Sequence, residues 1–179
     1  MVQNMAKIII VYSTTDGHTK EICQRLKEVI EAQENQVALV SVEDTNSTEL
    51  KSFDKIVLGA SIRYGKHNPK VYQFIENNRE ILEQKSNAFF SVNVVARKPE
   101  KNTPETNPYL IKFLNQISWK PQNLAVFAGK IDYQKYQFFD RFMIHFIMWM
   151  TKGPTDPKTC VDYTDWKQVE EFDLTIDRM

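Results

Sequence analysis

Glycine and cysteine are scarce in this chain, which has five glycines and two cysteines among 179 residues. Cys23 and Cys160 are far apart and have no C-x-x-C or histidine spacing, so we expect neither a disulfide framework nor a metal site. The loop that follows the first apolar run contains a single glycine, Gly17, so the G-x-G-x-x-G motif of a Rossmann dinucleotide fold is missing. A Rossmann fold is therefore the second choice for this chain.

An excess of either charge is also lacking, because 23 Lys and Arg residues balance 23 Asp and Glu residues. This balance argues against nucleic-acid binding through bulk positive charge and against docking through a strongly acidic surface. No stretch approaches the ~20 apolar residues that span a bilayer, and residues 1–7 do not resemble a signal peptide. We therefore expect a cytoplasmic protein, at most peripheral on the inner face of the cell membrane.

Short apolar runs separated by amphipathic segments are the main pattern that is present. The runs at 7–12, 37–42, 55–60, 88–95 and 124–128 are typical of strands in a parallel sheet. Helices are predicted at 19–32, 68–76 and 108–117, and a last one that begins at Thr164 or Asp165. The alternation predicts one α/β domain over residues 1–179 with a flavodoxin-like, doubly wound, five-stranded parallel sheet in the order 2-1-3-4-5. A long insertion, 129–158, is predicted at the fifth strand.

The polar loop after the first strand is a candidate phosphate site. A helix N-terminus offers unpaired N–H groups and a partial positive charge, and a glycine allows close approach of the backbone. The loop lacks lysine and the G-x-x-x-x-G-K-[ST] pattern, which argues against nucleotide hydrolysis. An ordinary polar turn is the alternative interpretation. The residues are Ser13, Thr14, Thr15, Asp16, Gly17, His18 and Thr19.

Two further loops follow buried strands and should reach the same edge of the sheet. The first contains Ser61, Ile62, Arg63, Tyr64 and Gly65, and the second Asn93, Val94, Val95, Ala96 and Arg97. Surface loops with scattered charge are the alternative here. Tyr64 could lie against a flat ring held between the loops.

The amino-acid sequences of these loops resemble those of known families. T-x-D-G-x-T at 14–19 is similar to the T-x-T-G-x-T phosphate loop of flavodoxins, except for Asp16, whose carboxylate would repel phosphate unless it turned away to cap the helix. GASIRYG (59–65), SVNVVARKPEK (91–101), FDRFMI (139–144) and YTDW (163–166) resemble the flavodoxin-type, quinone-dependent protoporphyrinogen IX dehydrogenases of bacterial haem biosynthesis. The resemblance extends from about Lys7 to the last helix, with Met1–Met5 as an extension outside it.

This resemblance implies FMN as cofactor, protoporphyrinogen IX as substrate and a membrane quinone, such as menaquinone, as electron acceptor. FMN would then be bound by Ser13–Thr19, Ser61–Gly65 and Asn93–Ala96. The two propionates of the substrate call for cations, and we expect Arg63 and Arg97 to bind them. Tyr64 and His67 are candidates for proton handling, but the sequence identifies no catalytic acid or base.

The insertion contains an unusually apolar segment at 136–150. Its polar residues Gln137, Asp140, Arg141 and His145 form one narrow helical stripe, and residues 129–158 carry five basic and three acidic side chains, a net charge of plus two. Such a helix is either buried against the sheet or contacts a large apolar substrate or the membrane interface.

Two other functions are compatible with the same fold. One is a non-catalytic electron carrier of the flavodoxin type, against which the zero net charge and the apolar insertion argue. The other is an NAD(P)H:quinone reductase, for which the sequence offers no nicotinamide-binding feature.

Overall fold

Five parallel strands form the central sheet of the computed structural model, which describes residues 5–179. The order is β2-β1-β3-β5-β6, and each neighbouring pair is parallel. The strands are β1 (Lys7–Ser13), β2 (Gln36–Ser41), β3 (Lys55–Arg63), β5 (Ser86–Asn93) and β6 (Asn123–Ala128). The predicted order 2-1-3-4-5 of the main strands is thus confirmed. Residues 1–4 of the expected N-terminal extension lie outside the described residues.

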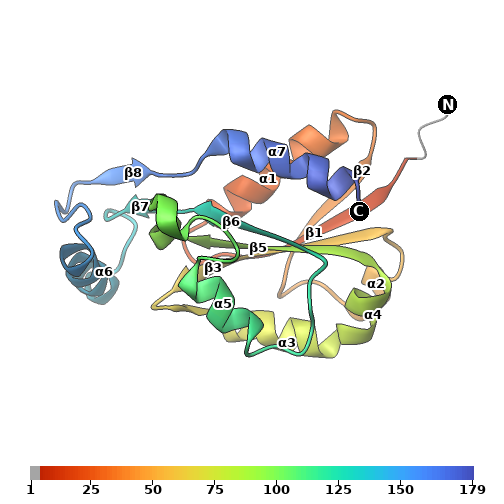
Figure 1. The fold of residues 1–179 in the computed structure, drawn as a ribbon, viewed down its shortest axis with the longest axis horizontal. Coiled ribbons are helices and arrows are strands. Elements are labelled where there is room, and N and C mark those ends of the chain that lie inside the picture. Colours follow the sequence, from red (N-terminus) through yellow and green to blue (C-terminus); the bar gives the residue numbers. More distant parts are fainter. Residues whose placement is uncertain (1–4) are drawn as a thin grey trace.

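Helices cover both faces of this sheet (Figure 1). One face carries α1 (His18–Glu31) and α7 (Trp166–Asp177), and the other carries α2 (Ser47–Leu50), α3 (Pro69–Asn77), α4 (Arg79–Gln84) and α5 (Pro108–Leu114). Strand β1 explains the arrangement, because Ile8 and Ile10 belong to the core under α1 and α7, whereas Ile9 and Val11 belong to the opposite core. The strand is buried on both faces, as its apolar run predicted.

Side-chain caps fix where the predicted helices begin. The Asn68 side chain accepts a hydrogen bond from the Lys70 amide, and the Asp165 side chain accepts one from the Gln168 amide. The predicted starts of α3 and α7 are therefore confirmed. The short helices α2 and α4 were not predicted, because four to six residues show too little periodicity to reveal a helix.

Strand β5 ends two residues before the end of the predicted range 88–95. The Asn93 side-chain oxygen accepts a hydrogen bond of 3.1 Å from the Ala96 amide, and this bond closes a 3-10 turn, Val94–Arg97. A local side-chain bond thus turns the chain away from the sheet. The turn brings the second flanking loop to the carboxyl edge.

The insertion forms a small unit beyond the end of the sheet (Figure 1). It consists of β7 (Lys130–Asp132), α6 (Phe138–Met150) and β8 (Cys160–Asp162), and β7 and β8 pair antiparallel. Tyr133, Tyr136 and Met148 form part of its own apolar core. The predicted bounds 129–158 therefore stop short of β8. Within residues 5–179, no helix combines the length and apolar character needed to cross a bilayer.

Candidate cofactor site

A cavity lies at the carboxyl ends of β1, β3 and β5, with α6 along one side. Thirteen of the sixteen predicted cofactor residues line it. They are Thr14, Thr15, Asp16, His18, Thr19, Ser61, Ile62, Arg63, Tyr64, Gly65, Asn93, Val94 and Val95. Ser13, Gly17 and Ala96 belong to the same loops but are not among the lining residues in the described part of the chain. The three loops therefore meet, as the parallel strand order requires.

The first loop has the geometry of an anion site. Gly17 adopts a left-handed conformation (φ 91°) just before α1, and its amide donates to Thr14 Oγ1 at 3.0 Å. The hydroxyl of Thr19 is fully buried, and within residues 5–179 it has no hydrogen-bond partner. An unpaired buried hydroxyl costs about 1–3 kcal/mol, and the Thr19 hydroxyl, which lines the cavity, is therefore a candidate donor to a ligand. A phosphate at the start of α1 would accept this hydrogen bond, and the residues therefore fit a flavin phosphate.

Asp16 pairs with Arg63 and does not cap α1, in contrast to the expectation from the sequence. Burial raises the pKa of the Asp16 carboxyl, and the charge and hydrogen bond of Arg63 oppose this effect without cancelling it. The Arg63 guanidinium carbon also lies 5.1 Å from the centre of the Tyr136 ring in the insertion. Arg63 therefore neutralises Asp16 beside the phosphate loop and links this loop to the insertion.

A tight turn presents Tyr64 at the rim of the cavity. Tyr64 (φ 51°) and Gly65 (φ 75°) both have positive φ, as in a two-residue hairpin turn between β3 and β4 (Lys66–His67). A side chain at Gly65 would meet the ring of Tyr109 at 3.5 Å. The partly exposed Tyr64 donates its hydroxyl proton to Asp140 of α6. The first flanking loop thus holds the N-terminal turn of α6.

His67 lies in the core and not in the cavity lining described for residues 5–179. Its Nδ1 lies 3.0 Å from the carbonyl oxygen of Ser61, and its ring packs against Phe89 and Phe113. Burial lowers its pKa to about 4, so the ring is neutral at physiological pH. The structure therefore gives His67 a packing role and does not favour it for proton handling.

Arg97 holds the other end of α6. Its guanidinium donates to the Val94 carbonyl at 3.0 Å and to the carbonyl and hydroxyl oxygens of Thr151 at 3.4 and 3.3 Å. Its guanidinium carbon also lies 5.9 Å from the centre of the Tyr163 ring. Arg97 is not among the cavity-lining residues of the described chain, which differs from the position expected of a substrate ligand.

Arg97→Ala is expected to loosen the C-terminal turn of α6, because the substitution removes the two hydrogen bonds to Thr151 that join this turn to the second flanking loop. Amide exchange in this turn should reflect a local opening free energy lower by about 1–2 kcal/mol. Hydrogen exchange resolved by mass spectrometry measures the change. Arg79→Ala, which breaks an exposed pair with Glu83 on α4, is the control. Unchanged exchange in α6 of Arg97→Ala would contradict this role.

The insertion contributes most of the lining residues that the sequence did not predict. They are Lys130, Ile131, Asp132, Lys135, Tyr136, Ile144, Ile147 and Met148, and Glu21, Val92, Tyr109 and Gly129 complete the wall. Positions 144, 147 and 148 form one helical stripe, but a helix that is apolar on most sides does not show which of its apolar stripes faces inward.

The outward face of α6 is apolar. Asp140 near the start of the helix binds Tyr64, and the exposed Arg141 donates from Nε to the Tyr133 carbonyl at 3.1 Å. Six large apolar side chains of this helix are between 45% and 89% exposed, namely Phe138, Phe139, Phe142, Phe146, Trp149 and Met150. They form the outer face of α6. So large an exposed apolar surface is unusual for a helix in water and marks a contact surface.

Known proteins match this chain in sequence and in fold. A family model described as a flavodoxin domain matches residues 9–158. A Leishmania major protein named protoporphyrinogen IX dehydrogenase (quinone) is 45% identical over 174 residues, 96% of this chain and 75% of that protein. A protein of the same name from Escherichia coli strain K12 is 42% identical over 166 residues, 93% of this chain and 92% of that protein.

Solved structures show the same fold at lower identity. Oxidised flavodoxin 1 from Bacillus cereus superposes with a TM-score of 0.56 at 16% identity and covers 97% of this chain and 98% of its own. A flavodoxin from the domain Archaea gives 0.55 at 16% identity, with 96% of both chains covered. The flavodoxin-like fold is therefore established.

Proposed function

This chain belongs to the flavodoxin-like family of quinone-dependent protoporphyrinogen IX dehydrogenases, and we propose that it oxidises protoporphyrinogen IX to protoporphyrin IX in haem biosynthesis, with FMN as cofactor. Electrons would pass to a membrane quinone such as menaquinone. The observation that carries this proposal is 45% identity over 96% of the chain, a coverage that includes most of the apolar insertion. The insertion in turn supplies one wall of the cavity.

In this proposal each of the three loops binds a different part of FMN. The Thr19 hydroxyl and the first amides of α1 would hold the phosphate, and Gly17 lets the backbone turn beneath it. The loops 61–65 and 93–96 would flank the ring, with Tyr64 against one face. When bound, the flavin supplies the redox chemistry, since it can take up two electrons and release them again.

Cations and an apolar wall suit the substrates proposed here. Arg63, Lys130 and Lys135 line the cavity and would attract the propionates of a porphyrinogen. Ile147 and Met148 offer an apolar surface to the macrocycle or to a quinone. In this proposal Arg97 acts on the substrate only through the position of α6.

We propose further that the outer face of α6 inserts into the membrane interface on the cytoplasmic side, where the quinone is dissolved. The helix is 13 residues long and has exposed aromatic side chains, as interfacial helices do. The insertion carries a net charge of plus two, and exposed Lys135 and Lys152 flank the helix, so anionic headgroups would add attraction.

An anaerobic flavin titration tests the function. The purified protein should be yellow, and protoporphyrinogen IX should bleach its flavin absorbance, which a menaquinone analogue then restores. Bleaching by NADPH but not by the porphyrinogen would instead favour an NAD(P)H:quinone reductase. A flavin that neither compound reduces, but that accepts electrons from a reductase, would indicate an electron carrier.

A further inference from the structure

Two buried asparagines pair with each other beneath the second flanking loop. Asn93, at the end of β5, is 3% exposed, and Asn107, the residue that caps α5, is fully buried. Asn107 Nδ2 donates to Asn93 Oδ1 at 3.0 Å, and Asn93 Nδ2 donates back to Asn107 Oδ1 at 3.3 Å. Asn93 lines the cavity, whereas Asn107 is not among the lining residues of the described chain. Asn107 can therefore act on the site only through other residues.

The partners of Asn107 explain why an amide is needed at this position. Its Oδ1 also accepts from the Leu110 amide at 3.2 Å, which caps α5, and its Nδ2 also donates to the Lys101 carbonyl at 2.8 Å. Serine, threonine or aspartate would cap the helix as well. Among these cap-forming side chains only an amide has a donor and an acceptor group placed to pair with Asn93 in both directions. The amide of Asn107 thus serves the loop in addition to the helix.

Asn93 transmits this contact to the loop itself. Its Oδ1 accepts from the Ala96 amide at 3.1 Å and so closes the turn Val94–Arg97, while its Nδ2 also donates to Ser91 Oγ at 3.2 Å. With the pair to Asn107, both side-chain amides make four hydrogen bonds, which is their full capacity. A buried polar network with every group satisfied makes the backbone that it binds rigid.

Asn107 holds the segment 94–101 at both ends. The first 3-10 turn is bound through Asn93, and a second 3-10 turn, Pro99–Lys101, is bound directly through the Lys101 carbonyl. Val94 and Val95 of the first turn line the cavity. The position of this part of the cavity wall therefore depends on a side chain that lies behind it.

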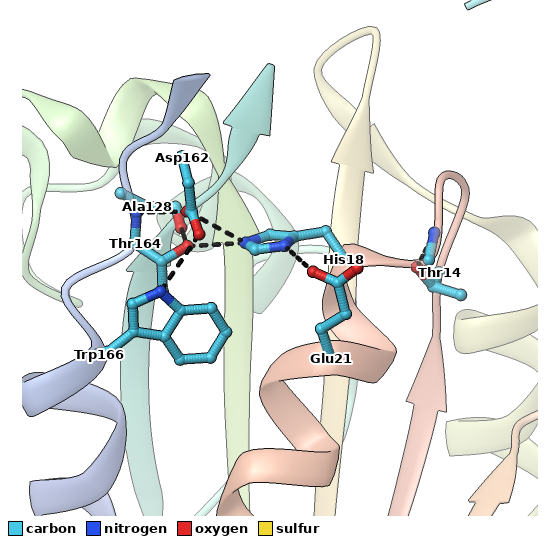
Figure 2. A network of polar contacts seen from close by, with 8 residues as sticks. Thr14, His18, Glu21, Ala128, Asp162, Thr164 and Trp166 are labelled. Carbon is cyan, nitrogen blue, oxygen red and sulfur yellow. Dashed lines mark hydrogen bonds and ion pairs between the residues drawn. The ribbon is translucent and has the colours of Figure 1, made fainter. Parts of the chain in front are cut away.

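The polar contacts at the phosphate loop form a separate group (Figure 2). The ring nitrogens of His18, the first residue of α1, lie 2.9 Å from Glu21 Oε2 and 2.7 Å from Thr164 Oγ1. Within residues 5–179, no side-chain hydrogen bond joins this group to Asn93 or Asn107. The asparagine pair thus acts on the second flanking loop and not on the phosphate loop.

We propose that Asn107 is a positioning residue of the flavin ring site: its amide holds Asn93 and the Lys101 carbonyl and thereby fixes the second flanking loop beside the ring. The proposal rests on the FMN binding proposed above, which assigns this loop to the ring. The phosphate has no part in it. Loosening the loop should therefore weaken FMN and riboflavin, which lacks the phosphate, by the same factor.

Flavin titration of the apoprotein tests the proposal, with FMN and riboflavin as probes. Asn107→Ser keeps a hydroxyl that can cap α5 but loses the bonds to Asn93 and Lys101. Both flavins should bind about fivefold to twentyfold more weakly, with equal factors, as quenching of flavin fluorescence measures. At saturating flavin, the visible circular dichroism should also change, because it reports the surroundings of the bound ring.

Asn87→Ser is the matched control, since Asn87 lies near the start of the same strand, at the opposite edge of the sheet, and is 1% exposed. Its side chain donates to the carbonyls of Leu82 and Lys85 at 2.8 and 3.1 Å and accepts from the Gln122 amide at 2.8 Å. The control should lose thermal stability as Asn107→Ser does. Its flavin affinities and the dichroism of its bound flavin should stay as in the wild type.

Ser91→Ala is a milder variant, which removes one partner of Asn93 and leaves the cap of α5 untouched. It should weaken both flavins by about twofold to threefold. Three results would overturn the proposal. They are unchanged affinities in Ser91→Ala and in any Asn107→Ser protein that folds, a loss confined to FMN, and an equal loss in Asn87→Ser.

Hydrogen exchange of the apoprotein separates this proposal from the proposed function. Asn107→Ser should speed exchange of the Ala96 amide, because the Asn93 acceptor is no longer held, and Asn87→Ser should not. A wild-type protein that binds neither flavin would refute the proposed function and with it the ring site. A wild type that binds both, with variants in which Ala96 exchanges as before, would refute the role of Asn107 alone.

Discussion

Replacing both Phe142 and Trp149 with glutamate is expected to release the protein from lipid vesicles and to leave FMN binding intact. The two side chains are 63% and 68% exposed on the outer face of α6, so the substitution does not alter the cavity wall. Burying one large apolar side chain contributes about 1.5–3 kcal/mol, and two carboxylates add a cost of their own. The partition coefficient should therefore fall at least about a hundredfold.

Flotation with vesicles that contain anionic lipid measures this partition, and flavin fluorescence measures FMN binding in the same samples. Leu174→Glu is a matched control, because Leu174 is 51% exposed on α7, on the face of the sheet that α1 and α7 cover. The control should float as the wild type does. With a short-chain quinone in solution, both variants should turn over normally. A double variant that still floats, or that loses FMN, would contradict the assignment of this face to the membrane.

The fold could be predicted because its determinants are local. The apolar run of β1 and the caps at Asn68 and Asp165 act within a few residues, and each is recognisable in the sequence. The end of β5 was predicted wrongly, since a strand-like run continues to Val95 while the Asn93 side chain closes a turn. A polar residue that competes with the sheet for hydrogen bonds is difficult to distinguish from one that faces solvent.

The candidate site could be predicted only as far as strand order determines it. A parallel sheet predicts that the three loops meet at its carboxyl edge, but it does not predict which side chains of the loops and of α6 contact each other. Arg63 meets Asp16 across 47 positions of sequence, and Tyr64 meets Asp140 across 76. The contact of Tyr64 with Asp140 and the bonds of Arg97 to Thr151 hold the two ends of α6, so that its apolar residues 144, 147 and 148 line the cavity. No periodicity of the helix itself contains that information.

Thr19→Val is expected to weaken FMN binding about tenfold to a hundredfold while leaving the apoprotein as stable as before or more stable. The buried Thr19 hydroxyl lacks a partner within residues 5–179, so replacing it with a methyl group removes a cost of about 1–3 kcal/mol from the apoprotein. The same change removes a hydrogen bond to a charged phosphate, which contributes about 1.5–3 kcal/mol when FMN is bound.

Thermal unfolding with and without FMN separates the two effects, because the stabilisation by a ligand depends on its Kd. Thr14→Val is the informative comparison, since Thr14 Oγ1 accepts a hydrogen bond from the Gly17 amide. That variant should lose stability in the apoprotein as well, whereas Thr19→Val should not. The opposite signs arise because one hydroxyl already supports the loop and the other is unpaired without its ligand. A Thr19→Val apoprotein that melts lower than the wild type, with unchanged FMN affinity, would show that the hydroxyl serves the fold and not the phosphate.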